Sequence, residues 1–180
     1  MKKEKIVLFD AVEKCLTNAD QIFEEAQILK KYSKIYRAYT LFQFCIEEIG
    51  KVGLIYKYLF HHDVTDKSVM EKFHKEFRDH KKKISASIFF DKILDVVIME
   101  EDEDFKQRWI DSYTSHLNNI HVFNDLKNLS LYTSFYNNKY CLPSEFIDEE
   151  MLENIEFFAK SRLTMAKNFH TVALTKPDDF

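Results

Sequence analysis

The sequence contains few of the residues that interrupt helices or form tight turns. Its 180 residues include only 2 glycines and 2 prolines. Strand-rich folds need turn residues about every ten positions, so a strand-rich fold is not expected. Long helices joined by few connections are the predicted architecture.

Cysteine is also scarce. The 3 cysteines, Cys15, Cys45 and Cys141, are odd in number and have no CxxC spacing, which indicates neither a disulfide framework nor a zinc site. A reduced, cytoplasmic setting is therefore expected. The sequence has no HxxxH or HExxH motif, no glycine-rich phosphate loop and no GxSxG motif. We expect no metal and no cofactor.

Long apolar runs and an excess of positive charge are missing as well. No run of about 18 uncharged apolar residues occurs, so no membrane span is predicted. The apolar stretch after Lys2, Lys3 and Lys5 is too short for a signal peptide. The formal net charge of -4 and the pI near 6.0 argue against a protein that coats nucleic acid, although a small local basic site remains compatible with them.

Apolar residues, in contrast, are plentiful. Hydrophobic residues make up 46% of the chain and aromatic residues 15%, enough for one packed core. We predict one domain over residues 1–175, followed by a polar tail at 176–180. The expected fold is an all-α, up-and-down helical bundle of five to six helices.

Apolar stripes with steps of three and four place the expected helices. The first two expected helices cover about 4–32 and 33–61, and a third begins at 68. A fourth covers 105–120, after the acidic run 100–104, and the last begins at 143. Ser68 with Glu71 is a capping-box pattern for the third helix, which is long or kinked near Lys81–Lys83. Residues 118–143 are predicted as a polar, aromatic-rich loop with a short helical or extended piece at 127–132.

The second predicted helix is the most informative segment. Its apolar face carries Ala38, Phe42, Cys45, Ile49, Val52, Tyr56 and Leu59. Glu48 lies on the flank of that face, where a carboxylate is costly to bury unless something pairs with it. Gly50 and Gly53 lie beside it, and their missing side chains would let another helix approach closely.

The two glutamates of this helix have different interpretations. Glu47 and Lys51 are four residues apart, which favours a surface salt bridge. Glu48 is explained equally well as a surface group or as a half-buried carboxylate that orients a basic partner.

His80 is the second candidate. It lies on an apolar stripe between Phe77 and Ile84, with Lys83 three residues on. An isolated histidine at such a position is most simply a core or boundary residue. If the second and third helices pack together, however, Glu48 reaches His80, and a carboxylate-oriented histidine is a standard acid or base for RNA cleavage.

Two basic segments complete the candidates. Lys127, followed by Tyr132, suits phosphate contact and hydrogen bonding, although a packed tyrosine and an extended lysine are the simpler interpretation of this spacing. The run Lys81–Lys83 is most simply a solvated face, with contact to a nucleic-acid backbone as the alternative.

Three segments in series resemble the AbiV family of abortive-infection proteins. Residues 38–51 read A-x(8)-E-E-x-G-K, residues 77–83 read F-x-x-H-x-x-K, and residues 127–132 read K-x-x-x-L-Y with Pro143 following. The order and rough spacing of the family's segments agree, and the match covers most of the chain.

The resemblance implies an all-helical HEPN domain, a homodimer with its active site at the interface, and a toxin-like effector of bacterial phage defence. By position, the implied site consists of Glu47, Glu48, Lys51, His80, Lys127 and Tyr132. One departure concerns the R-x(4–6)-H motif of catalytic HEPN nucleases. None of the four arginines, Arg37, Arg78, Arg108 and Arg162, has a histidine at that spacing.

Three hypotheses follow. In the first, the chain is a ribonuclease that cleaves cellular or phage RNA and so shuts down translation or phage propagation. His80 would then be the general acid or base, Glu48 would orient it, and Tyr132 would donate a hydrogen bond. The phosphate-binding group would consist of Lys51 and Lys127, with Glu47 and Lys83 nearby. In the second, the same residues form a non-catalytic surface that docks a phage or translation-machinery protein. In the third, the charged cluster only fixes helix register.

Overall fold

The computed structural model describes residues 3–91, 107, 110–111, 114 and 118–175. Its helices are α1 Lys3–Lys31, α2 Ile35–His61, α3 Lys67–Arg78, α4 His80–Ser87, α7 Ile120–Leu131 and α8 Glu149–Thr175. Between α7 and α8 lie the strands β1 Ser134–Tyr136 and β2 Lys139–Cys141 and the 3-10 turn Pro143–Glu145. The predicted all-α bundle is confirmed, with a small hairpin added to it.

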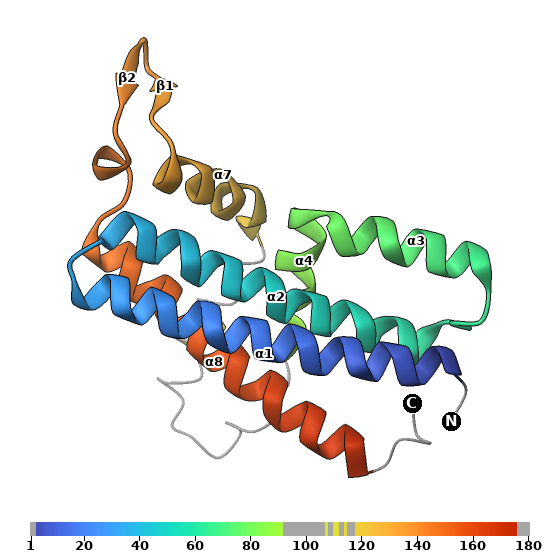
Figure 1. Cartoon of the computed structure of the whole chain (residues 1–180). Coiled ribbons are helices and arrows are strands. Elements are labelled where there is room, and N and C mark those ends of the chain that lie inside the picture. The colour runs from blue at the N-terminus through green and yellow to red at the C-terminus, as the bar shows by residue number, and fades with distance from the viewer. Residues whose placement is uncertain (1–2, 92–106, 108–109, 112–113, 115–117, 176–180) are drawn as a thin grey trace.

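Helix α2 is the centre of the bundle. It packs against α1, α4, α7 and α8. In the view of Figure 1, α1 runs beside α2, α8 lies below it, and α3, α4 and α7 lie above it. This surrounding explains why α2 is buried on nearly all sides over its middle turns, where Phe42, Ile46 and Ile49 have no exposed surface. The predicted boundaries of α1 and α2 agree with those observed.

The third predicted helix is broken into α3 and α4 at Asp79. The Asp79 side chain accepts a hydrogen bond from the backbone N–H of Lys82 at 3.1 Å and so caps the start of α4. The break therefore comes just before the predicted kink at Lys81–Lys83. Helix α3 starts at Lys67, and Asp66 caps it by accepting from the N–H groups of Ser68 and Val69, so the predicted Ser68–Glu71 capping box is wrong.

The segment predicted as a loop at 118–143 is also different. It contains α7, which includes all but the last residue of the predicted short piece at 127–132, and then the β1–β2 hairpin. Asn137 and Asn138 form the hairpin turn with φ of 48° and 61°, a left-handed conformation that asparagine tolerates better than most residues. Phe135 pairs with Tyr140 across the antiparallel strands.

The remaining predicted segments are the last helix, the helix at 105–120 with the acidic run before it, and the tail. Helix α8 begins at Glu149, six residues later than predicted, because Pro143–Glu145 forms a separate 3-10 turn. The predicted helix at 105–120 and the acidic run at 100–104 lie almost entirely outside the described residues, as does the tail at 176–180. No helix within the described ranges is long and apolar enough to cross a membrane.

Candidate functional site

A buried carboxylate lies in the middle of α2. Glu47 is only 3% exposed, although sequence reasoning assigned it to a surface salt bridge. Lys51, the expected partner, bonds to Glu48 instead, so that prediction is wrong. Because an ionised carboxylate is costly to bury alone, Glu47 requires partners from neighbouring helices.

Two glycines bring one of those helices close. A β-carbon added at Gly50 would lie 1.9 Å from the carbonyl oxygen of Lys83, and one added at Gly53 would lie 2.4 Å from that of Ala86. The backbones of α2 and α4 are therefore in direct contact, which confirms the close approach predicted at these glycines. This contact places the first turn of α4, with His80 and Lys83, over Glu47.

The Glu47 cluster, which we define as Glu47, His80, Lys83 and Lys127, joins three helices. Glu47 Oε2 accepts from His80 Nδ1 at 2.6 Å and pairs with Lys83 Nζ at 2.8 Å. Glu47 Oε1 accepts from Lys127 Nζ at 2.6 Å. Lys127 Nζ also donates to Asn124 Oδ1 at 3.3 Å. Residues from α2, α4 and α7 that are far apart in the sequence therefore share one carboxylate.

The Glu47 contact determines how His80 is oriented. A carboxylate oxygen only accepts, so the 2.6 Å contact assigns the imidazole proton to Nδ1 and leaves Nε2 as an acceptor. The His80 side chain is 55% exposed, and its Nε2 bonds to none of the residues that the structure describes. The result is an imidazole held by a buried carboxylate at one nitrogen and open to solvent at the other.

Electrostatics keep Glu47 ionised. Burial is the largest influence on its pKa and acts to raise it, but hydrogen bonds from Lys127, Lys83 and His80 outweigh burial and hold the pKa below its usual value. With neutral His80, the cluster then has two ammonium groups and one carboxylate. This excess of one positive charge, next to an exposed imidazole, favours an anionic ligand.

The two lysines of the cluster are mainly internal. Their side chains are almost fully buried, and their ammonium groups lie 3.4 Å (Lys83) and 3.2 Å (Lys127) from His80 Nδ1. Since their donors point at Glu47 and its surroundings, they position the cluster and contribute to its field. Contact between Lys127 and a phosphate stays a prediction, while in the structure the ammonium of Lys127 bonds to Glu47 and Asn124.

Glu48 does not reach His80. It forms an ion pair with Lys51, three residues on, and the ammonium of Lys51 lies 5.3 Å from the centre of the Phe77 ring. The prediction that Glu48 orients His80 is therefore wrong: Glu47 has that position. Neighbouring residues on a helix point about 100° apart, so only one of the two glutamates faces α4 and α7.

Tyr132 is also separate from the cluster. It follows the last residue of α7 and its side chain is exposed. It lies five residues after Lys127, which places it on a different side of the helix. No hydrogen bond within the described ranges joins its hydroxyl to the cluster.

A second buried ion pair escaped sequence reasoning. Arg162 of α8 donates from Nε to Asp91 Oδ1 at 2.8 Å and from Nη2 to Asp91 Oδ2 at 2.5 Å, while its Nη1 donates to Ser87 Oγ at 3.0 Å. All three residues are buried. An arginine between Phe158 and Ala166 on an apolar stripe was the available signal. This pair ties α8 to the end of α4 and so supports the placement of the cluster.

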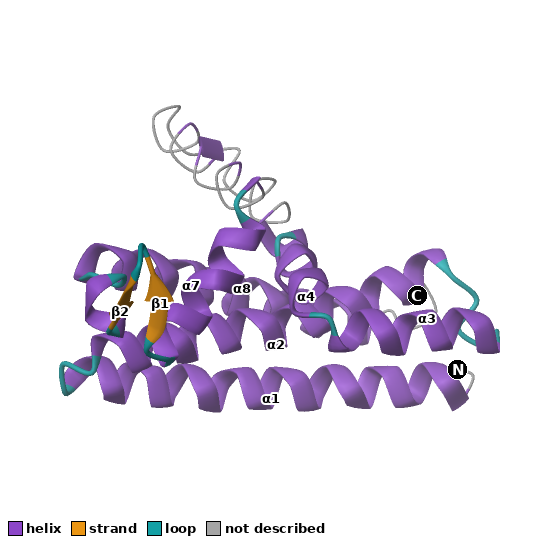
Figure 2. Ribbon diagram, turned by 90° about the horizontal axis from the view of Figure 1, so that it is seen from above, coloured by secondary structure: helices purple, strands orange, loops and turns teal. Residues whose placement is uncertain are grey.

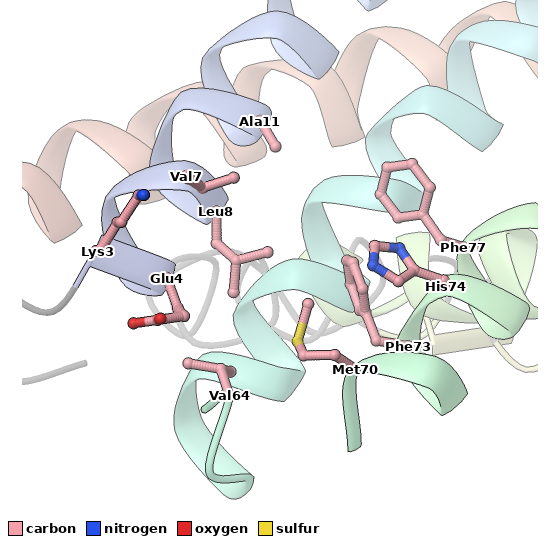
Figure 3. A pocket seen from close by; sticks show the side chains of 10 residues that line it. All are labelled: Lys3, Glu4, Val7, Leu8, Ala11, Val64, Met70, Phe73, His74 and Phe77. Carbon is pink, nitrogen blue, oxygen red and sulfur yellow. The ribbon is translucent and has the colours of Figure 1, made fainter. Parts of the chain in front are cut away.

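An apolar groove lies between α1 and α3. Its volume is about 440 Å³, and side chains such as Val7, Leu8, Met70 and Phe73 line it from both helices. Figure 3 shows these side chains around the groove. None of the four residues of the Glu47 cluster lines it, so the groove is not part of the candidate site.

The described residues support neither cysteine-based nucleophilic chemistry nor a metal site. The thiols of Cys15 and Cys45 are buried, and burial raises the pKa of Cys15 to about 11, which makes it a poor nucleophile. Within the part of the chain that is described, no group of three or more histidine, cysteine, aspartate or glutamate residues is arranged to bind a metal.

Comparison with known proteins identifies the family of the chain. The model of the HEPN_AbiV family, described as AbiV, matches residues 7–164. No curated protein and no solved structure matches the chain. The matched range contains all four residues of the Glu47 cluster as well as Glu48, Lys51 and Tyr132. The chain therefore belongs to the AbiV family of HEPN proteins and is of the abortive-infection type.

Proposed function

We propose that this chain is an abortive-infection effector that acts on RNA, with His80 as the catalytic base of strand cleavage. The observation that carries this proposal is the 2.6 Å hydrogen bond between buried Glu47 and the exposed imidazole of His80. A carboxylate at Nδ1 fixes the tautomer and leaves Nε2 free to accept a proton.

The reaction that suits such a base is transesterification within RNA. Nε2 of His80 accepts the proton of a ribose 2′-hydroxyl, and the 2′-oxygen attacks the adjacent phosphorus. The bond from phosphorus to the 5′-oxygen breaks, and that oxygen takes a proton from water. The products are a 2′,3′-cyclic phosphate and a 5′-hydroxyl, and the imidazolium returns its proton to the hydroxide that remains.

Lys83 and Lys127 have supporting roles in this proposal. They keep Glu47 ionised and add positive field where the phosphorane carries extra negative charge. Within the described ranges, no hydrogen bond or ion pair joins Glu48, Lys51 or Tyr132 to the cluster, so the proposal gives them no part in the chemistry.

The setting proposed is the one that the family resemblance implies. We propose that the effector acts in the bacterial cytoplasm, as a homodimer with the two His80 side chains near a shared interface. In the dimer, the second imidazole would replace water as the proton donor to the 5′-oxygen.

The test combines cleavage with phage defence. Purified wild type, His80→Ala, Glu47→Gln and Glu48→Gln are incubated with a fluorescent RNA, and the products are analysed for 2′,3′-cyclic ends. We expect His80→Ala to reduce cleavage at least about 100-fold, because general base catalysis contributes that much. Glu47→Gln should reduce cleavage as well.

Glu48→Gln is the matched control, since it changes an adjacent glutamate that lies outside the cluster. It should cleave RNA and protect cells from phage in plaque assays as wild type does. His80 is exposed, so the His80→Ala protein should remain folded, as circular dichroism would verify. A folded His80→Ala variant that cleaves like wild type would reject the proposal.

A second function is favoured by the absence of R-x(4–6)-H and by the internal character of the two lysines. In it, the chain is a non-catalytic binding module that docks a phage or translation-machinery protein. This function predicts no RNA cleavage by wild type and recovery of a specific protein from infected cells. Cleavage that depends on His80 would exclude it.

A further inference from the structure

Positive charge is concentrated beside His80. Residues 67–83 contain seven lysines and arginines against three aspartates and glutamates, a formal net charge of +4 in a chain of net charge -4. Arg78, Lys81 and Lys82, which we call the basic strip, flank His80 and are exposed. None of the three forms an ion pair with a described residue, so their charges face solvent.

Two exposed aromatic rings lie in the β1–β2 hairpin, which follows the C-terminal end of α7. Phe135 and Tyr140 are directly opposed in the β1–β2 hairpin, with ring centres 5.2 Å apart. They are 64% and 78% exposed. On the other side of the hairpin, Cys141 is buried and Tyr136, which is 54% exposed, packs edge-on against Phe146. Phe135 and Tyr140, which we call the aromatic pair, therefore form the outward side.

The two features lie on the same side of the molecule. In Figure 1 the hairpin, α7, α4 and α3 all lie above α2, and in Figure 2 α4 lies between α7 and α3. Lys127 of α7 is 3.2 Å from His80, and the chain from Lys127 to Phe135 spans at most about 20 Å. The order along this side is basic strip, His80, α7 and aromatic pair.

We propose that the basic strip and the aromatic pair are the two ends of a binding track for single-stranded RNA that crosses His80. Exposed cations bind the phosphates of any RNA, whereas exposed rings stack on bases only when the bases are unpaired. The track therefore selects single strands over duplexes, in which base faces are covered.

This inference rests on the proposed action on RNA and names the class of RNA. A protein partner on the hairpin would explain the aromatic rings but not the exposed cations beside His80. A track for single-stranded RNA accounts for both features and for their positions on either side of the exposed imidazole.

The test measures binding separately from cleavage. The probe is a fluorescein-labelled RNA of about 12 nucleotides whose 2′-hydroxyls are all methylated, so that it binds without being cleaved. Fluorescence anisotropy compares the single strand with the same strand annealed to its complement. Wild type should bind the single strand at least about tenfold more tightly.

Two double variants test the two ends of the track. Phe135→Ala/Tyr140→Ala should weaken single-strand binding about 10- to 100-fold and leave the salt dependence unchanged. Lys81→Ala/Lys82→Ala should weaken binding to both RNA forms and lower the salt slope by roughly 1 to 1.5. Phe157→Ala/Leu174→Ala and Lys14→Ala/Lys160→Ala, which remove exposed residues from other helices, are the matched controls and should bind as wild type does.

Distinct outcomes separate this inference from the proposed function. RNA binding without cleavage would support the track and reject the proposed chemistry. Equal affinity for single and double strands, or unchanged affinity after loss of the aromatic pair, would overturn the track. A Phe135→Ala/Tyr140→Ala variant that binds RNA normally but changes its oligomeric mass would also overturn the track, because the aromatic pair would then be a protein interface.

Discussion

At the scale of single residues, Glu47 and Glu48 show how one step along a helix changes a role. Glu47 faces α4 and α7 and bonds to His80, Lys83 and Lys127. Glu48 pairs with Lys51 and lies near enough to α1 to influence the pKa of Cys15. Their sequence contexts are nearly the same, so only the packing of α2 distinguishes the two carboxylates.

Glu47→Gln should destabilise the fold much more than Glu48→Gln at neutral pH. The substitution leaves the nearly buried ammonium groups of Lys83 and Lys127 without an anionic partner, and we expect a loss of about 2 to 4 kcal/mol in the free energy of unfolding. Glu48→Gln, at a partly exposed pair, should cost less than about 1 kcal/mol. Urea denaturation at pH 7 measures both values.

The difference in free energy of unfolding between wild type and Glu47→Gln depends on pH, because the pKa of Glu47 is lowered in the folded state. A carboxyl group with a lowered folded pKa stabilises the fold above its unfolded pKa, near 4.5, and loses this contribution as pH falls through the folded pKa. The gap between wild type and Glu47→Gln should therefore shrink as the pH falls below about 4.5. A gap of the same size at pH 3 would contradict this account of Glu47.

At the scale of elements, the contact between α2 and α4 decides whether a site exists. Helix α4 is short, from His80 to Ser87, and its position depends on backbone contact at Gly50 and Gly53. The Asp79 cap fixes where α4 starts, and so it fixes which residue of the chain occupies the position over Glu47.

Gly50→Ala should separate α4 from α2. The added β-carbon would meet the carbonyl oxygen of Lys83, which is backbone and cannot rotate away. We expect the free energy of unfolding to fall by about 2 kcal/mol or more, although alanine favours the helix itself by about 1 kcal/mol. Chemical denaturation measures this loss, and Glu24→Ala, at an exposed position of α1, is the control.

The same variant should lose activity beyond its loss of stability. If α4 moves, His80 leaves the reach of Glu47, so the folded protein should cleave RNA poorly at temperatures well below its midpoint. Wild-type stability and cleavage for Gly50→Ala would show that α4 can shift without cost, and the close contact would then have no functional meaning.

The elements also differ in how well sequence patterns predicted them. Helices α1 and α2 have long apolar stripes, and their boundaries were predicted within a few residues. Residues 118–143 were predicted as a loop with a short helical or extended piece at 127–132, because the hairpin turn uses Asn137 and Asn138 rather than glycine. Long periodic segments are predictable because burial of one face dominates their stability, whereas short elements depend on local contacts.

At the scale of the whole molecule, the predicted homodimer is the property that most affects the proposed mechanism. Sedimentation equilibrium should give twice the 21.6 kDa mass of one chain at micromolar concentration. A general acid and a general base are both needed for rapid RNA cleavage, and each chain presents one exposed imidazole at its Glu47 cluster. A monomer with full cleavage activity would show that one chain is sufficient.

The sequence by itself determined the helical class, the family and most of the site's residue types. Periodic apolar residues and scarce turn residues predicted helices, and three short motifs predicted the AbiV family together with His80 and Lys127. Tertiary structure alone decided that Glu47 rather than Glu48 binds His80, that Lys83 and Lys127 are internal, that Tyr132 stands apart, and that Arg162 pairs with Asp91. The physical reason is that sequence patterns report which face of one helix is apolar, whereas a site depends on the rotation of that helix against its neighbours.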